Sequence, residues 1–178
     1  VGYLTVPGVD VTDEPILQHP TDDDYYLTHN EFDRESIWGA YFVPSEWNVS
    51  NVDDMYRVTV IFGHSNGNSM HKKFSVLKYF RDVNFAKEHR YIYLTLGEQQ
   101  TRWKIFAVAD YPIDPSYTIA NPDDSYFLTE IASMKAYSYN LYATEVGLND
   151  KVLILSTCSG SDNYDTRFIV CAKLDEVF

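Results

Sequence analysis

A cysteine and an arginine lie near the end of the chain with a spacing that could support thiol chemistry. Cys158 ends the apolar run Lys151–Cys158, Arg167 opens the run Thr166–Leu174, and the polar loop Ser159–Asp165 joins the two. A thiol at a strand end, beside a loop and near a guanidinium, has the partly exposed, electropositive setting of a reactive cysteine. Burial as an inert packing residue is the other common role of a cysteine. Both interpretations of Cys158 stay open on this local pattern.

The second cysteine, Cys171, is predicted not to form a disulfide with Cys158. If Cys158 faces Arg167 in an antiparallel hairpin, paired residue numbers sum to 325, and Cys171 then faces Ile154. That position lies four residues from Cys158, or about 13 Å along the strand. A disulfide needs its two Cα atoms within about 7 Å. We therefore expect Cys171 to be a small apolar packing residue.

Among the histidines, His64 is the best candidate for the base that a thiol nucleophile needs. It follows the apolar run Val58–Gly63 and precedes the polar residues 65–68, at the mouth of a strand, where functional residues concentrate. A loop imidazole without a function is the alternative. No histidine follows Cys158, which excludes the papain-like order of cysteine before histidine. The remaining histidines have no comparable placement: His19, His29, His71 and His89.

The composition indicates one acidic, globular, sheet-rich domain spanning residues 1–178. The chain has 26 Asp and Glu against 14 Lys and Arg, a net charge of −12, and 45% hydrophobic residues. Aromatic residues make up 16% of the chain, and tyrosine and phenylalanine favour strands. The negative charge disfavours nucleic acid or an anionic membrane surface as an electrostatic partner, although a local basic site stays possible.

Eight segments have the β-branched and aromatic residues and the flanking turn formers that predict strands. Eight strands are enough to close a small barrel or to form a sandwich. The segments are Tyr3–Val6, Pro15–Gln18, Trp38–Val43, Tyr56–Gly63, Tyr91–Leu96, Trp103–Ala109, Lys151–Cys158 and Thr166–Leu174. In the last of them, alternation places Phe168, Val170, Ala172 and Leu174 on one face and Arg167, Ile169, Cys171 and Lys173 on the other.

Two segments, Ser69–Arg81 and Asp123–Tyr139, have apolar residues at helical spacing behind residues that can cap a helix. Asp124 or Ser125 is the expected cap of the second. Their apolar stripes are expected to face the core. These stripes are Met70, Phe74, Leu77 and Phe80 or Arg81 in the first segment, and Phe127, Leu128, Ile131, Met134 and Tyr137 or Ser138 in the second. The segment Asp22–Asn30 could hold a short helical turn. Because the helices interrupt the strands rather than alternating with them, a wound parallel sheet is disfavoured and the fold class is mainly β.

The candidate residues resemble the motifs of the sortase family. Sortases carry a T-L-x-T-C motif, and the run Leu155-Ser156-Thr157-Cys158 matches it except at the first position, where Ile154 stands for threonine. Arg167 on the next strand and Gly63-His64 at the end of an earlier one complete the resemblance.

The resemblance extends over essentially the whole chain. The segments Gly2–Gly8, Pro15–Gln18 and Asp24–Leu27 look like the first units of the family. The long helix at Asp123–Tyr139, before the cysteine strand, is similar to class B sortases.

What the resemblance implies is an eight-stranded sortase-type β-barrel with inserted helices, forming a single catalytic domain over residues 1–178, and a cysteine transpeptidase mechanism. The Cys158 thiolate would attack the carbonyl of the bond between a threonine and the following glycine or asparagine in a C-terminal sorting signal and form a thioacyl-enzyme. His64 would protonate the leaving amine and deprotonate the incoming one, and Arg167 would stabilise the oxyanion. Further candidates for the substrate groove are Ser156, Thr157 and Asn30.

The resemblance also implies partners and a location. The partners would be surface proteins or pilins with a C-terminal sorting motif, together with a cell-wall peptide or a pilin lysine as the amine acceptor. The enzyme would act on the extracellular face of the plasma membrane of a Gram-positive bacterium, through an upstream anchor outside this chain. No cofactor or metal is expected, and the acidic runs Asp22–Asp24 and Asp53-Asp54 are interpreted as solvated loops rather than calcium sites.

Two other functions compete with this prediction. A β-barrel cysteine peptidase would use the same three residues and release its product to water. A non-catalytic surface β domain would leave the Cys158 thiol unreactive.

Overall fold

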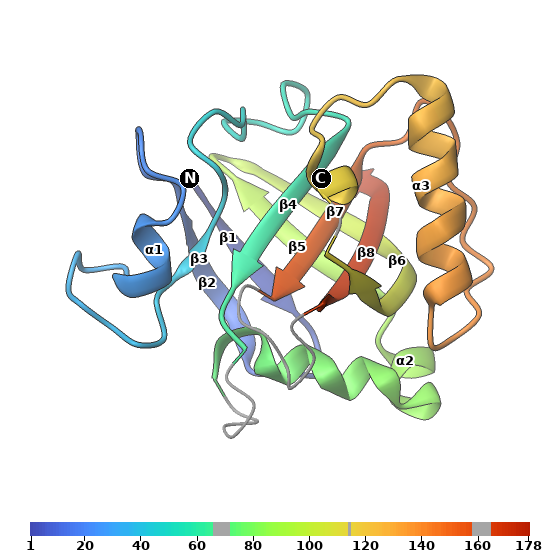
Figure 1. The fold of residues 1–178 in the computed structure, drawn as a ribbon, viewed down its shortest axis with the longest axis horizontal. Helices are drawn as coiled ribbons and strands as arrows, with labels where there is room; N and C mark the ends of the chain where they lie inside the picture. The colour runs from blue at the N-terminus through green and yellow to red at the C-terminus, as the bar shows by residue number, and fades with distance from the viewer. Residues whose placement is uncertain (66–71, 114, 158–164) are drawn as a thin grey trace.

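The computed structural model describes residues 1–65, 72–113, 115–157 and 165–178. In these ranges eight strands close into a barrel in the order β1-β2-β3-β4-β7-β8-β6-β5 (Figure 1). Each predicted strand segment overlaps one of these strands, so the mainly β, eight-stranded barrel is confirmed, although β1, β2, β6 and β8 extend beyond the predicted bounds. The strands are β1 (Gly2–Val6), β2 (Val11–Leu17), β3 (Tyr41–Phe42), β4 (Val58–Gly63), β5 (Tyr91–Leu96), β6 (Gln99–Pro112), β7 (Val152–Thr157) and β8 (Thr166–Val177).

Strands β4 and β7 pair in parallel although they lie far apart in sequence. Their register runs from Val58 opposite Val152 to Gly63 opposite Thr157. Because parallel strands point the same way, the residues that follow β4 and β7 leave the barrel at the same end. Figure 1 shows the two strands side by side with their arrowheads at the same end of the barrel.

The hairpin between β7 and β8 has the register that the sequence predicts. Ile154 pairs with Cys171, and Ser156 pairs with Ile169, so each pair of numbers sums to 325. Cys171 is a free thiol with no exposed surface, and burial raises its pKa above the ordinary range. Its predicted role as an apolar packing residue is confirmed.

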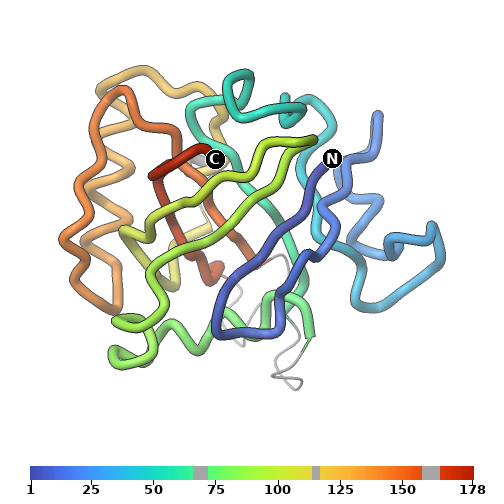
Figure 2. Tube along the Cα trace, turned by 180° about the vertical axis from the view of Figure 1, so that it is seen from behind, coloured from blue at the N-terminus to red at the C-terminus, as the bar shows by residue number. Residues whose placement is uncertain are grey.

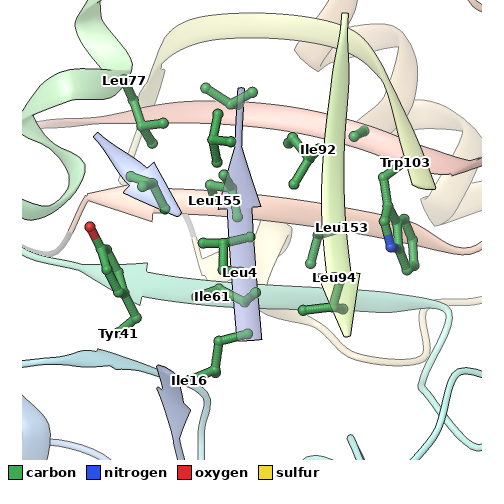
Figure 3. Packing of buried hydrophobic residues seen from close by; sticks show 14 of the residues in the cluster. Leu4, Ile16, Tyr41, Ile61, Leu77, Ile92, Leu94, Trp103, Leu153 and Leu155 are labelled. Carbon is green, nitrogen blue, oxygen red and sulfur yellow. The ribbon is translucent and has the colours of Figure 1, made fainter. Parts of the chain in front are cut away.

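Two hydrophobic clusters lie on opposite sides of the barrel wall. The inner cluster fills the barrel, and Figure 3 shows Leu4, Ile61, Leu94, Trp103 and Leu155 pointing into it from different strands. The outer cluster lies between the wall and a helix; it includes Val60, Phe106, Phe127, Ile154 and Cys171. Alternation along β8 assigns Phe168, Val170 and Ala172 to the inner cluster and Ile169 and Cys171 to the outer one, as predicted.

The helix over the outer cluster is α3 (Asp124–Tyr137), the long helix predicted before the cysteine strand. Asp123, rather than Asp124 or Ser125, caps it, because the Asp123 side chain accepts a hydrogen bond from the Tyr126 amide. Phe127, Ile131 and Met134 are buried, whereas Leu128 and Tyr137 of the predicted stripe are exposed. The apolar stripe is therefore narrower than predicted, because only one side of α3 contacts the barrel.

The predicted helix at Ser69–Arg81 differs in type and in length. The structure has a 3₁₀ helix, η1 (Lys73–Arg81), followed by a short α-helix, α2 (Val83–Glu88). Phe74, Leu77 and Phe80 are all fully buried, and a spacing of three residues forms one stripe on a 3₁₀ helix. Residues 69–71 lie outside the described ranges.

Two shorter helices complete the described chain: α1 (Tyr25–Thr28), inside the segment expected to hold a helical turn, and η2 (Pro115–Thr118). From behind, Figure 2 shows β1 lying alongside β5, which confirms how the first strand closes the barrel. In the described ranges, no helix has the length and apolar character needed to cross a membrane.

Candidate functional site

A groove of about 540 Å³ lies where the ends of β4, β7 and β8 face two loops. We call the strand side, which includes Phe62, Thr157 and Arg167, the strand bank. We call the loop side, which includes Asp23, Asp24, Leu27, Pro44 and Trp47, the loop bank. Phe42 of β3 and Thr118 of η2 complete the lining. Two of the predicted site residues, Thr157 and Arg167, therefore line one groove.

The strand bank is held by the sheet. Thr157 is the last described residue of β7, and its Oγ1 accepts a hydrogen bond of 3.1 Å from the Phe168 amide. Arg167 precedes Phe168, pairs with Tyr111 of β6, and is partly buried. Its Nη1 donates to the neighbouring carbonyl of Thr166, at 3.2 Å, and no described acidic residue forms an ion pair with it. The guanidinium charge at the groove is therefore not neutralised by an ion pair with a described acid.

His64 follows β4 directly and contacts the loop bank. Its Nε2 lies 2.5 Å from the carbonyl oxygen of Leu27, a residue that lines the groove. A carbonyl oxygen only accepts hydrogen bonds, so Nε2 carries a proton and donates it. The backbone is fixed as well, because the Phe74 amide donates to the His64 carbonyl at 2.9 Å. The ring orientation is thus set, and Nδ1 is the ring atom left to take up and release a proton.

A glycine lets the loop bank approach His64. Gly39 has a φ of +54°, and a Cβ at this position would overlap the Tyr26 carbonyl oxygen and lie 3.1 Å from Cδ2 of His64. The Ala40 amide donates to that same Tyr26 carbonyl at 2.9 Å. Only glycine fits both the backbone conformation and the close contact. The position of Leu27 against His64 depends on this packing.

Cys158, the predicted nucleophile, lies outside the described residues. The structure does describe Thr157, the residue before Cys158, and the strands on either side of it. Thr157 is opposite Gly63 in the parallel register and is hydrogen-bonded to Phe168. The residue after Gly63 is His64, and the residue before Phe168 is Arg167. The end of β7 therefore lies between the strand ends that carry His64 and Arg167.

Comparison with known proteins supports one family. No protein-family model matches the chain. A curated relative, sortase B of Listeria monocytogenes, is 28% identical over 176 residues, which cover 98% of this chain and 69% of the relative. A solved structure of sortase B from Listeria monocytogenes is 26% identical, covers 98% of this chain and 93% of its own, and superposes with a TM-score of 0.83.

The chain is similar in sequence to sortase B and has the fold of class B sortases. The Staphylococcus aureus sortase B–substrate complex shares the fold, with a TM-score of 0.86 over 99% of this chain and 79% of its own, at 21% identity. Class B sortases are cysteine transpeptidases, and this enzyme class applies to the chain.

Not every predicted site residue of this class B sortase lies at the groove. Ser156 has no exposed surface, and its Oγ is 3.2 Å from the hydroxyl of Tyr117 in η2. Asn30 serves its own loop, because its Oδ1 accepts hydrogen bonds from the amides of Phe32 and Arg34 at 3.0 and 3.2 Å. Neither residue is part of the groove lining.

Most residues of the loop bank have no signal in the sequence that predicts a site. Pro44 and Trp47 come from segments without a motif, and only the position of an apolar residue in a polar loop could have indicated Trp47. Leu27 ends the segment Asp24–Leu27 of the resemblance, but nothing in that segment indicates its contact with His64. Gln18 holds this bank: its Nε2 lies 2.7 Å from the carbonyl oxygens of both Pro44 and Trp47.

The described acidic residues form no metal centre. Among residues 1–65, 72–113, 115–157 and 165–178, no group of three or more histidine, cysteine, aspartate or glutamate side chains is placed to hold an ion. Asp23 accepts a hydrogen bond from the Ser45 amide, and Asp22 accepts one from the Asp24 amide. These carboxylates organise the loop bank.

Proposed function

We propose that this sortase cleaves a C-terminal sorting signal after a threonine and transfers the new carboxyl end to an amine. The observation that carries the proposal is the convergence at the end of β7. Thr157 and Arg167 line one groove, and His64 is hydrogen-bonded to the Leu27 carbonyl of the opposite bank. A nucleophile directly after Thr157 would lie between a base and a cation.

Each candidate has a defined part in the proposed reaction. The Cys158 thiol gives its proton to His64, the thiolate attacks the carbonyl carbon of the threonine, and the carbon–nitrogen bond breaks as His64 passes that proton to the leaving amine. The result is a thioester to Cys158. The incoming amine then attacks the thioester, loses its proton to His64, and displaces the thiolate. An acid–base group of this kind contributes about 10²–10⁴ in rate.

Arg167 would stabilise the negative oxygen that develops on the carbonyl in both steps. The Arg167 guanidinium forms no ion pair with a described acidic residue. Arg167 lines the groove from β8, whose backbone is fixed by pairing with β6. A donor held in place before the reaction stabilises a developing oxyanion at little reorganisation cost. Arginine also offers a planar fork that can contact the oxyanion and a substrate carbonyl together.

The groove is suited to an extended peptide with apolar and small polar residues. Phe42 and Phe62 stack at 5.6 Å between ring centres, and Trp47 adds a third aromatic ring to the lining. Aromatic side chains supply large contact areas with limited conformational entropy to lose. In this proposal the substrates are surface proteins or pilins that present a short extended segment near their C-terminus.

The acceptor would be a primary amine of a cell-wall peptide or a pilin lysine. One of the similar structures is a sortase B in complex with triglycine, a peptide with a free amine, at 21% identity and a TM-score of 0.86 over 99% of this chain and 80% of its own. This similarity supports amine transfer in general. A location on the extracellular face of the plasma membrane of a Gram-positive bacterium, through an upstream anchor, is part of the same proposal.

Product analysis tests the proposal. Peptides with a central Thr-Gly or Thr-Asn bond are incubated with the enzyme, with and without triglycine, and the products are identified by mass spectrometry. We expect cleavage after threonine and a triglycine adduct that increases with amine concentration. Release of the free acid alone, at the same rate with triglycine, would indicate a β-barrel cysteine peptidase. No cleavage and no reaction of Cys158 with iodoacetamide would indicate a non-catalytic surface domain.

A further inference from the structure

A second cavity, of about 450 Å³, lies where α2, β6 and the segment after α3 meet. We call it the basic cavity. It shares no lining residue with the groove that contains Arg167. Figures 1 and 2 both show α2 next to one end of α3, at a distance from the loop that carries α1. The basic cavity is lined by Val83, Ala86, Lys87, Arg90, Lys104, Ile105, Tyr139, Asn140, Leu141, Tyr142, Ala143 and Thr144.

Three cations line the basic cavity, and its described lining contains no carboxylate. Lys87 and Arg90 come from α2 and the residues after it, and Lys104 comes from β6. None of the three forms an ion pair with a described acidic residue. Other cations of this chain are neutralised in that way, for example Arg57 by Asp124.

This arrangement runs against the charge of the whole chain. Acidic residues outnumber basic ones by 26 to 14, so carboxylates to pair with these cations are plentiful. Three cations around one cavity repel one another when no described carboxylate pairs with them, and a bound anion relieves that repulsion. The concentration of positive charge therefore points to an anionic ligand.

A buried hydroxyl gives a second indication. The hydroxyl oxygen of Tyr142 is buried and has no hydrogen-bond partner within the described part of the chain. Leaving a buried polar group unpaired is unfavourable, and a ligand that pairs with it removes that penalty. Burial raises the pKa of Tyr142 to about 12 against the opposing effects of the nearby Asn140 side chain and the Arg90 charge, so the hydroxyl keeps its proton near neutral pH and can donate to a ligand oxygen.

We propose that the basic cavity binds an organic phosphate. A phosphate monoester carries a charge of about −2 and three acceptor oxygens, which matches three cations better than a single carboxylate does. The cavity is larger than a phosphate group alone requires, and Ala86, Ile105 and Ala143 provide apolar wall for an organic part. This site is separate from the proposed transpeptidase groove and does not depend on its function.

Titration with two soluble phosphates tests the site. Phenyl phosphate and inorganic phosphate are added to the isotope-labelled protein, and amide chemical shifts are followed by NMR. We expect saturable shifts confined to residues 86–90, 104–105 and 139–144, with phenyl phosphate binding about tenfold more tightly than inorganic phosphate because its ring adds apolar contact.

A charge-matched pair of variants separates the site from general electrostatics. The triple variant Lys87→Gln/Arg90→Gln/Lys104→Gln should weaken phenyl phosphate binding by at least about tenfold. The triple variant Arg34→Gln/Lys72→Gln/Lys78→Gln changes the net charge by the same amount outside the cavity and should leave the affinity within about twofold. Tyr142→Phe keeps the ring and should weaken binding about threefold.

The source of the phosphate is identified by a third arm with vesicles of phosphatidylglycerol. If the protein sediments with these vesicles and the cavity triple variant does not, the phosphate is assigned to a lipid headgroup. Saturable binding of phenyl phosphate without sedimentation would assign it to a soluble molecule. Absence of saturable shifts at ~10 mM phenyl phosphate, or equal weakening by the two triple variants, would overturn the proposal.

Discussion

The two banks of the groove are built by different means. The strand bank belongs to the barrel, where β7 and β8 pair along their length and Thr157 is tied to Phe168. The loop bank lies outside the sheet and is held by a few hydrogen bonds from side chains to backbone, such as those from Gln18 to Pro44 and from His64 to Leu27.

This difference indicates a division of labour. A bank fixed by paired strands suits groups that must stabilise a transition state without moving. A bank held by a few bonds opens at low free-energy cost and suits substrate entry and recognition. Changes to the strand bank should therefore act mainly on kcat, and changes to the loop bank mainly on KM.

The largest effect is expected for Arg167→Lys in the strand bank. Lysine keeps the charge but loses the planar fork, so kcat should fall by about two to three orders of magnitude. KM should change less, because the lost interaction forms in the transition state. Steady-state kinetics with a cognate peptide measures both constants.

Arg102→Lys is the matched control. Arg102 also lies next to β8 but at the far end of β6, where it pairs with Asp175 and Glu176. It should leave kcat unchanged. A near-normal kcat for Arg167→Lys would remove Arg167 from the chemistry and assign it to the hairpin end.

Gly39→Ala tests the contact between the loop bank and His64. The new methyl group would overlap the Tyr26 carbonyl and displace the loop, so we expect kcat/KM to fall about ten- to a hundredfold. Gly97→Ala is a control with the same kind of strain, because Gly97 has a φ of +58° but only a contact of 4.0 Å with Ser50. If both variants lose activity equally, backbone strain rather than the His64 contact is responsible.

Gln18→Ala should loosen the loop bank without touching the reacting groups. It removes the donors to the carbonyls of Pro44 and Trp47, each at 2.7 Å. We expect KM to rise about three- to tenfold with kcat nearly constant, and the free energy of unfolding to fall by about 1–2 kcal/mol. Gln100→Ala, on β6, serves as the control. A fall in kcat alone would contradict the proposed role of this bank in recognition.

The smallest effect is expected for Ser156→Ala, a residue next to the nucleophile in sequence. Its side chain is buried and bonded to Tyr117, so the change should lower the free energy of unfolding by about 1 kcal/mol. KM and kcat should stay within about twofold. A marked rise in KM would instead show that Ser156 binds the substrate, as the motif alone suggests.

The strand bank could be predicted from the sequence because strand pairing follows a simple pattern. Alternation and the positions of Cys158 and Arg167 give the hairpin register, and the pairing of Ile154 with Cys171 confirms it. The type of the helix η1 was harder to predict. Phe74, Leu77 and Phe80 are spaced by three in the sequence, but this spacing indicates a 3₁₀ helix only when the three side chains are known to share one buried face.

The loop bank could not be predicted in the same way. The partner of His64 is a backbone carbonyl 37 residues earlier, and a backbone oxygen has no sequence signature. Asn30 is a groove candidate of the resemblance, yet its amide oxygen accepts hydrogen bonds from the Phe32 and Arg34 amides. Local hydrogen bonding of this kind is the usual role of asparagine in turns.

The central claim is that the residue after Thr157 is the nucleophile of a sortase reaction. Intact-protein and peptide mass spectrometry after rapid acid quenching, with a cognate peptide and no amine, tests it most directly. We predict a thioacyl adduct on Cys158 that disappears when triglycine is added, is absent in Cys158→Ala, and persists in Cys171→Ala. An adduct on another residue, or turnover by Cys158→Ala, would contradict the account.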